Sequence, residues 1–268
     1  MSLPINLVLV RHGQSEGNAA KRRSEHGDHA AYTEEFKSRH SSSFRLTDKG
    51  RQQAVAAGQL LETLFPKGFD RYYTSEYARA KETAALLALP DAKWYPNFYI
   101  TERDWGELEV ASEEEREEKF GAALKRREAD PFFWRPPNGE SFANLCMRID
   151  RGILFTLHRE CHDKNALIVC HGEVMRAIQV CIERMTQQRF KELTFTENSD
   201  ERIYNCQIIH YTRRNPKTNE LSPYVNWMRM MRPGTTPLWD TGWQDIVRPK
   251  YSNQGLLDMV EQITRMVS

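Results

Sequence analysis

The sequence has almost no net charge and no long hydrophobic run. Its 38 Lys and Arg residues are balanced by 37 Asp and Glu residues, so no overall field favours binding to nucleic acid or to an anionic membrane. Nowhere do about 18 apolar residues run together, and the first residues lack the basic and apolar regions of a signal peptide. We therefore expect a cytoplasmic protein without nucleic-acid or membrane partners.

Cysteine is scarce and shows no metal-binding or redox spacing. The five cysteines are an odd number and contain no C-x-x-C pair, which argues against a disulfide framework and against a zinc site. Because they lie mostly within apolar patterns, we expect reduced core residues, and we expect no metal and no cofactor. The chain of 268 residues is long enough to bury the core of one large α/β domain.

Two apolar runs end at a His-Gly pair. Residues 5–10 and 166–170 have the apolar pattern of strands buried in a parallel sheet. The first run is followed by Arg11 and His12, and the second is followed directly by His171. Ligands of open α/β sheets bind outside the carboxyl ends of the strands. The sequence therefore places both histidines where a site is expected.

Helical patterns alternate with these strands. Residues 47–65 form an amphipathic pattern behind Thr47, a typical N-cap residue. Residues 70–75 predict a strand, and Ser75 is expected to cap a helix through Leu87 that carries Arg79 in its first turn. This alternation predicts an α/β three-layer sandwich, with a mostly parallel sheet and helices on both faces.

We expect one domain over residues 1–268, with its core in about 1–212 and three additions. Residues 19–44 are a polar, basic insertion, too long for an ordinary βα loop, which suggests a lid or a segment ordered by ligand. Residues 112–139 combine a charged helix, begun by a capping box, with an aromatic loop, and suggest a solvated flap. The tail 213–268 ends in an apolar helical face formed by Leu256, Val260, Ile263 and Val267. We expect it to dock on the core or, in a homo-oligomer, on another subunit.

Six motifs occur in the order of a known family. Residues 11–18, RHGQSEGN, resemble the R-H-G-x-S-x-x-N signature of the histidine phosphatase superfamily, which includes the cofactor-dependent phosphoglycerate mutases and the fructose-2,6-bisphosphatases. The other five segments that match are TDKG at 47–50, TSEYARAKETA at 74–84, ERDWGELE at 102–109, PNGES at 137–141 and VCHG at 169–172. The resemblance extends to about Tyr211 and implies a phosphoglycerate mutase-like fold. Residues 126–141 and Asn205-Cys206 resemble most the phosphoglycerate mutase-like proteins of plants and fungi.

This resemblance assigns roles that suit the chemistry of each residue. A neutral His12 would attack phosphorus and form a phosphohistidine. Glu102 would protonate the leaving alcohol and then take a proton from the hydrolytic water. Arg11 and Arg79 present planar forks of N–H donors to phosphate oxygens.

The remaining phosphate contacts follow from the same match. Asn18 adds a neutral donor, and the resemblance implies further contacts from His171 and Gly172. We therefore expect a phosphatase that hydrolyses a small phosphate monoester, and no metal ion is needed. Asp104 and Glu107 are reserve candidates for the proton donor.

Three alternative functions differ from this hypothesis. The mutases of the family have S-x-W-N after the first His-Gly pair and H-G-N at the second. This chain has Gly17 in place of the Trp and Glu173 in place of the Asn of H-G-N, which favours hydrolysis. Cys170 to Arg176 has the C-x-x-x-x-x-R spacing of cysteine-dependent phosphatases, but Glu173 would place a carboxylate in the anion-binding loop. The chain could also be a non-catalytic binding module, although no catalytic residue is missing.

Other charged residues have ordinary interpretations. We expect the remaining histidines to be exposed: His26, His29, His40, His158, His162 and His210. A second anionic group of the substrate could contact one of five arginines that are otherwise expected on a solvated surface: Arg22, Arg23, Arg126, Arg127 and Arg135.

Overall fold

The computed structural model describes residues 2–267, and its strands form one sheet. The sheet has the order β3-β2-β4-β1-β5-β6-β7, and β8 also pairs with β6. The strands are β1 (Asn6–Arg11), β2 (Arg71–Ser75), β3 (Trp94–Asn97), β4 (Asn165–Cys170), β5 (Ile208–Thr212), β6 (Trp227–Arg232), β7 (Trp239–Asp240) and β8 (Gln244–Asp245).

The strands β1 to β4 are parallel to one another. In the β1–β4 pair, Asn6 lies opposite Asn165 and Arg11 lies opposite Cys170. This register makes both strands end at the same edge, so the residues that follow them emerge side by side. From β5 onward the pairs are antiparallel. The predicted α/β fold, a mostly parallel sheet with helices, is confirmed.

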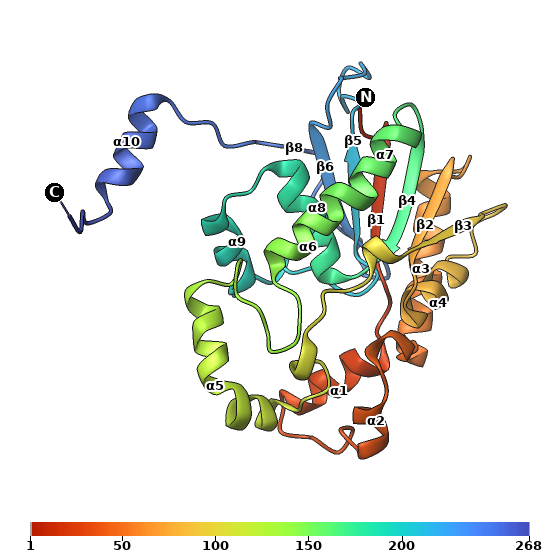
Figure 1. Cartoon of the computed structure of the whole chain (residues 1–268). Helices are drawn as coiled ribbons and strands as arrows, with labels where there is room; N and C mark the ends of the chain where they lie inside the picture. The colour runs from red at the N-terminus through yellow and green to blue at the C-terminus, as the bar shows by residue number, and fades with distance from the viewer. Residues whose placement is uncertain (1, 268) are drawn as a thin grey trace.

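Helices cover both faces of the sheet (Figure 1). Alternate residues of β1 pack into two different cores, as expected for a buried strand. Leu7 and Leu9 join one core with residues of α6 and α8, whereas Val8 and Val10 join another with residues of α3 and α4. The helices are α1 (Glu16–Ser24), α2 (Glu34–Ser38), α3 (Asp48–Leu64), α4 (Ala78–Leu86), α5 (Glu113–Ala129), α6 (Phe142–Ile149), α7 (Phe155–Glu160), α8 (Gly172–Glu183), α9 (Gln187–Thr194) and α10 (Asn253–Glu261).

Local capping explains where several helices begin. Thr47 accepts a hydrogen bond from the backbone of Gly50 at the start of α3, as predicted. Ser112 and Glu115 form the predicted capping box of α5. The prediction for Ser75 is wrong: α4 begins after Tyr77, without a side-chain cap. The Ser75 hydroxyl is instead used inside the site described below.

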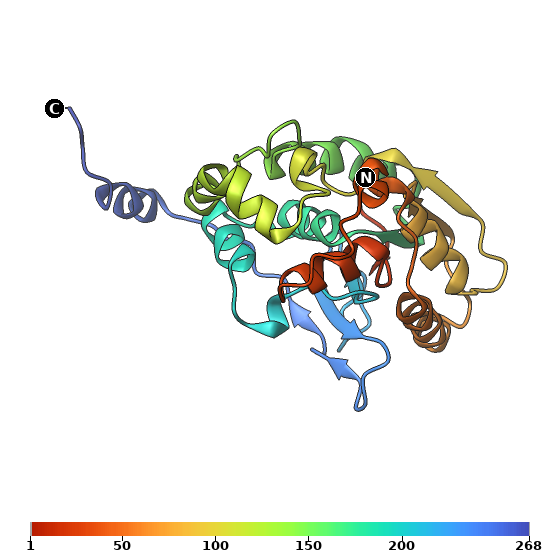
Figure 2. The same cartoon turned by 90° about the horizontal axis from the view of Figure 1, so that it is seen from below.

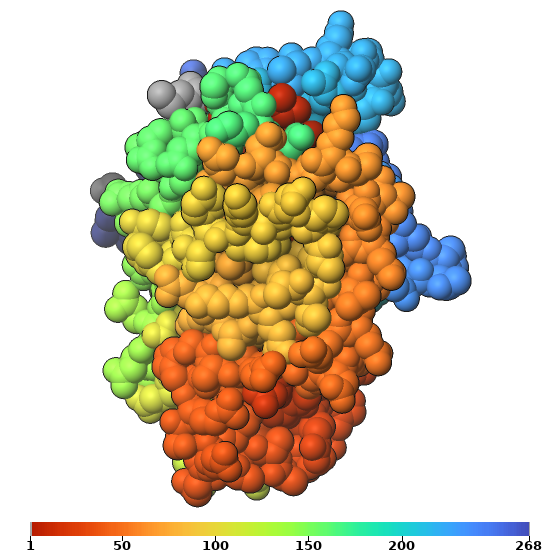
Figure 3. Space-filling view, turned by 90° about the vertical axis from the view of Figure 1, so that its right-hand side faces the viewer, coloured from red at the N-terminus to blue at the C-terminus, as the bar shows by residue number. Residues whose placement is uncertain are grey.

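The insertion and the charged flap lie together beyond the carboxyl ends of the parallel strands. The insertion contains most of α1 and all of α2, and the Nζ of Lys37 lies 2.8 Å from a carboxylate oxygen of Glu115 on α5. Seen from below, α1 crosses this end of the sheet beside α5 (Figure 2). The space-filling view shows the orange-red insertion as one continuous end of the molecule (Figure 3).

The tail divides into a part that joins the sheet and a part that stands apart from the body. Its strands β6, β7 and β8 extend the sheet, but the apolar helical face that was expected to dock is exposed. The helix α10 stands apart from the body (Figure 1), and all its residues except Gly255 are exposed. It ends at Glu261, so Ile263 and Val267 of the predicted face lie beyond it. Among residues 2–267, no helix combines the length and apolarity needed to cross a membrane.

The prediction that His210 is exposed is wrong. His210 lies on β5, where every residue is buried, and its Nε2 is 2.9 Å from Asn6 Oδ1. Its ring packs against Phe65 and Trp243. The tail covers this face of β5 with Trp243, a long-range contact that the local sequence does not reveal. Of the other histidines, His26, His40 and His162 are exposed, whereas His29 and His158 are half-buried.

Candidate active site

His12 directly follows β1 and is buried, with 2% of its surface exposed. Its Nδ1 lies 2.7 Å from the carbonyl oxygen of Gly13. A carbonyl oxygen only accepts hydrogen bonds, so Nδ1 carries the ring proton and Nε2 keeps its lone pair. The local backbone thus selects the tautomer in which Nε2 is the nucleophilic atom.

The turn that holds His12 is fixed by close backbone packing. The Gly13 N–H donates to Thr83 Oγ1 over 3.0 Å. A Cβ atom on Gly13 would lie 2.3 Å from the carbonyl oxygen of Gly50, closer than real Cβ atoms approach. Only glycine therefore fits between β1 and the start of α3, which accounts for the Gly of the His-Gly pair.

Arg79, the second residue of α4, is buried beside His12. Its Nε donates to His12 Nε2 over 3.3 Å, and its Nη1 donates to the carbonyl oxygen of Ser41 over 2.7 Å. Its guanidinium lies over the ring of Tyr77, 4.8 Å from the ring centre. The insertion therefore supplies a backbone anchor for an arginine of the site.

His171 follows β4, as predicted from the paired strand ends, and is fully buried. The centre of its ring lies 5.1 Å from that of His12. Its Nε2 is 2.8 Å from Ser75 Oγ, the hydroxyl predicted to cap a helix. Its Nδ1 is buried and has no hydrogen-bond partner among the described residues.

The guanidinium of Arg11 has one nitrogen that is hydrogen-bonded and another that lacks a partner. Its Nη1 donates to the carbonyl oxygen of Ile203 over 2.6 Å. Its buried Nε has no partner in the part of the chain that the structure describes. Gly172, at the start of α8, packs against this guanidinium: a Cβ on it would lie 3.4 Å from Nε, in ordinary van der Waals contact. Buried N–H groups without partners are rare and point to a missing ligand.

The electrostatics keep both histidines uncharged. Burial and the positive charges of Arg79 and Arg11 lower the pKa of His12 well below its usual value. Burial, Arg79 and His12 lower the pKa of His171 in the same direction. At neutral pH His12 is therefore a neutral imidazole whose Nε2 lone pair accepts a hydrogen bond from Arg79.

Glu102 lies across the pocket from His12, on the loop after β3. Burial raises its pKa to about 7, and the nearby Glu173 adds to this effect, while Arg79 and Arg11 oppose it. One carboxylate oxygen accepts from the backbone N–H of Arg103 over 3.0 Å. A carboxyl group with a pKa near 7 can both give and take a proton under physiological conditions.

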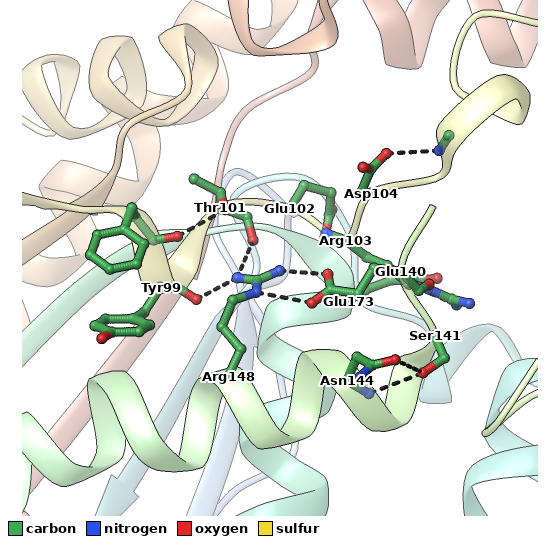
Figure 4. A network of polar contacts seen from close by, with 12 residues as sticks. Tyr99, Thr101, Glu102, Arg103, Asp104, Glu140, Ser141, Asn144, Arg148 and Glu173 are labelled. Atoms are coloured by element: carbon green, nitrogen blue, oxygen red, sulfur yellow. Dashed lines mark hydrogen bonds and ion pairs between the residues drawn. The ribbon is translucent and has the colours of Figure 1, made fainter. Parts of the chain in front are cut away.

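Two arginines hold the loop that carries Glu102 (Figure 4). Arg148 of α6 contacts both carboxylate oxygens of Glu140 and donates to the carbonyl oxygen of Thr101 over 3.1 Å. Arg103 donates to the carbonyl oxygen of Glu140 over 2.7 Å and to Glu173 Oε2 over 3.2 Å. Glu102 is thus positioned by contacts between three separate segments of the chain.

These groups surround a pocket of about 370 Å³. Six predicted residues line it: Arg11, His12, Asn18, Arg79, Glu102 and Gly172. The seventh, His171, is not among the lining residues, although its ring centre lies 5.1 Å from that of His12. Five wall residues with charged side chains were not among the predicted site residues: Lys21, Glu109, Arg116, Arg176 and Arg202. Lys21, Arg116 and Arg176 lie on helices and Arg202 lies in a loop, where no local pattern distinguishes them from solvated charges. Glu109 ends the matched segment 102–109 but was not assigned a role.

The reserve candidates lie outside this pocket. The Asp104 carboxylate accepts from the backbone of Gly106, and the Glu107 carboxylate accepts from Asn138. Besides Glu102, the carboxylates of Glu109 and Glu173 line the pocket, and burial raises the pKa of Glu109. Of the five arginines considered for a second anion, only Arg127 lines the pocket.

Cys170 is poorly placed for nucleophilic attack. It is fully buried within β4 and belongs to the core between the sheet and α6 and α8. Burial and the Glu102 carboxylate raise the pKa of its thiol, which opposes the thiolate that a cysteine-dependent phosphatase requires. All five cysteines are free, and four are buried. Among residues 2–267, no three His, Cys, Asp or Glu side chains gather as metal ligands would.

Known proteins resemble this chain in sequence. The chain is 30% identical over 218 residues to a 2,3-bisphosphoglycerate-dependent phosphoglycerate mutase of Bartonella bacilliformis, covering 76% of this chain and 97% of the relative. It is 29% identical over 250 residues to a phosphoglycerate mutase-like protein of Arabidopsis thaliana, covering 82% and 73%.

The solved structures with the same fold include phosphatases. A putative α-ribazole-5′-phosphate phosphatase of Escherichia coli superposes with a TM-score of 0.61 at 21% identity, covering 81% of this chain and 94% of the other. A mycobacterial glucosyl-3-phosphoglycerate phosphatase gives 0.60 at 20% identity, covering 77% and 92%. The model of the histidine phosphatase superfamily, branch 1, matches residues 7–212. The chain therefore belongs to the histidine phosphatase superfamily.

Proposed function

We propose that the protein is a phosphatase that hydrolyses a phosphate monoester through a phosphohistidine on His12. The observation that carries this proposal is the pair of buried, unpartnered nitrogen atoms, Arg11 Nε and His171 Nδ1, close to the neutral His12. The Ser75 hydroxyl can donate to Nε2 of His171, which leaves the ring proton on Nδ1 as a donor. Leaving such groups without partners costs about 1–3 kcal/mol each. An oxyanion of the substrate would satisfy both.

Catalysis would consist mainly of positioning and charge stabilisation. The phosphoryl group would lie between Arg11, Arg79 and His171, whose N–H groups donate to its oxygens. Arg79 now donates to His12 Nε2, so this bond must give way to phosphate as the lone pair attacks phosphorus. The P–N bond forms while the P–O bond to the alcohol breaks. The Nδ1–H bond to Gly13 stabilises the positive charge that develops on the ring.

Glu102 would transfer the protons. In the first step its carboxylic acid protonates the departing alkoxide. In the second step its carboxylate accepts a proton from the water that attacks the phosphohistidine, which restores neutral His12 and releases inorganic phosphate. The pKa of about 7 suits a group that serves as acid and then as base.

Hydrolysis and phosphoryl transfer to a second acceptor share the first step. The curated relatives named above are mutases or mutase-like, so the distinction depends on which acceptor reaches the phosphohistidine. Glu173 stands at the position of the mutase Asn and lines the pocket as an ion pair with Arg103. An added carboxylate repels an anionic acceptor, which favours water.

The outer pocket suggests an anionic substrate. Lys21 of α1 and Arg116 and Arg127 of α5 line its wall. Burial lowers the pKa of Lys21, and the positive charges of Arg116 and Arg127 lower it further, against the opposing effect of Glu25 and Glu113. Three cations therefore share this wall, and each repels the others. We propose that the substrate carries a second anionic group, which would relieve this repulsion.

The test is to supply an aryl phosphate and a panel of phosphate monoesters and to measure released inorganic phosphate, with and without excess chelator. We expect release at the same rate in both conditions. Movement of phosphate to a second site on the substrate, without release, would establish a mutase instead. Activity that disappears with chelator and returns with a divalent ion would overturn the proposed metal-independent mechanism.

A further inference from the structure

Asn205 contacts two parts of the candidate site from a loop far along the chain. It lies in the segment that precedes β5. Its Nδ2 donates to the carbonyl oxygen of His12 over 3.0 Å and to Asn18 Oδ1 over 3.0 Å. None of the proposed catalytic steps uses this residue.

The two contacts fix the direction of both amides. Both partners of Asn205 Nδ2 are acceptors, so only the NH2 end of this amide fits between them. Asn18 Oδ1 also accepts from the backbone N–H of Ser15 over 3.3 Å. With its oxygen engaged twice, Asn18 leaves its own NH2 group free to donate, and Asn18 lines the pocket.

The backbone beside Asn205 strengthens this connection. Cys206 has a φ of 56°, which non-glycine residues seldom adopt. In this conformation its N–H points at the end of β1, 3.1 Å from the carbonyl oxygen of Arg11 and 3.3 Å from that of His12. The loop is therefore anchored at the carbonyls of two proposed catalytic residues.

We propose that Asn205 is a positioning residue that orients the Asn18 amide with its NH2 group toward the phosphate and restrains the backbone of the nucleophile. The proposal rests on the proposed phosphatase site. It predicts that Asn205 acts largely through Asn18. Without Asn205, the Asn18 amide can turn and present its oxygen to an anion, which repels it.

The test is a double-mutant cycle on the full-length protein with Asn205→Ala, Asn18→Ala and the double variant. The readouts are kcat/KM for an aryl phosphate and the inhibition constant of vanadate. In the wild-type background we expect Asn205→Ala to lower kcat/KM and to raise the inhibition constant of vanadate, each by about 10-fold or more. In the Asn18→Ala background the same change should cost less than about 3-fold. Asn205→Asp should be worse than Asn205→Ala, because a carboxylate would face two acceptor oxygens.

Controls separate this role from folding and from the proposed function. Asn253→Ala, on the exposed α10, should leave both readouts unchanged, and thermal unfolding checks that each variant is folded. If Asn205→Ala is unfolded, the folded Asn205→Asp variant takes its place in the cycle. Equal losses in both backgrounds, or no loss, would overturn the role of Asn205 while leaving the phosphatase intact. A wild type that neither hydrolyses nor binds vanadate would refute the proposed function itself.

Discussion

The Nδ1 atom of His12 lies 2.7 Å from the carbonyl oxygen of Gly13, the next residue in the chain. This bond fixes the proton on Nδ1 and leaves Nε2 as a nucleophile, while Arg11 and Arg79 help to keep the ring neutral. The same two cations would hold a phosphate dianion. One arrangement thus activates the histidine and attracts its electrophile.

The role of Glu102 predicts a dependence on the leaving group. Glu102→Gln should greatly slow phosphorylation of His12 by alkyl phosphates, by about 100-fold or more, because their alkoxides need a proton. An activated aryl phosphate should lose much less. Rapid-quench measurement of the phosphorylation step with both substrates checks this.

Glu109→Gln is the matched control, because Glu109 is another carboxyl group of the pocket whose pKa is raised by burial. It should leave the dependence on leaving group unchanged. Equal losses on both substrates in Glu102→Gln, together with a selective loss in Glu109→Gln, would move the acid role to Glu109.

The pH profile follows from the same carboxyl group. The proton donor must be protonated, and burial raises the pKa of Glu102 to about 7. The rate of His12 phosphorylation by an alkyl phosphate should therefore fall as the pH rises through about 7. The pKa of His12 is lowered well below its usual value by burial and by Arg79 and Arg11, so its titration should not change the rate near neutral pH. A single-turnover profile that keeps this fall in Glu102→Gln would assign it to another group.

Arg79→Lys tests the value of the guanidinium fork. A lysine keeps the charge but cannot donate from two rigid nitrogens, as Arg79 now does to His12 and Ser41. We expect kcat/KM to fall by about 100-fold or more. Arg71→Lys, on β2 with its Nη1 bonded to a backbone carbonyl, should change kcat/KM less than about 2-fold. Comparable small effects in the two variants would show that charge alone suffices at position 79.

Two neighbouring arginines allow a test of the proposal that the substrate carries a second anionic group. Arg127 lines the pocket, whereas Arg126 is exposed and does not. Arg127→Ala should raise KM for a substrate with two anionic groups by about 10-fold, with a smaller effect on a simple aryl phosphate. Arg126→Ala should affect neither. Equal effects of Arg127→Ala on both substrates would exclude a specific second-anion contact.

Motifs at strand ends could be recognised in the sequence, whereas contacts between distant segments could not. The paired His-Gly sites were predictable because parallel strands end at one edge, and the structure indeed brings His12 and His171 together. Ser75 was predicted to cap a helix because capping is local, yet its hydroxyl contacts His171, 96 positions away.

The support of the Glu102 loop was missed for the same reason. Arg148 and Arg103 bind it through carbonyls and carboxylates from several segments, with no repeating pattern in the sequence (Figure 4). Lys21 looked like an ordinary surface charge, and Glu109, although it ends the segment 102–109, was one of several carboxylates near Glu102 that the sequence could not rank. Only the folded insertion and flap place them on the wall of a pocket.

The most direct measurement of the central claim is the identity of the phosphorylated residue. Rapid quenching with labelled substrate should trap an acid-labile, base-stable phosphoenzyme on the wild type and on Cys170→Ser. His12→Ala should yield none and should lose turnover, since no other nucleophile replaces Nε2. An acid-stable phosphoenzyme that disappears in Cys170→Ser and persists in His12→Ala would contradict the account.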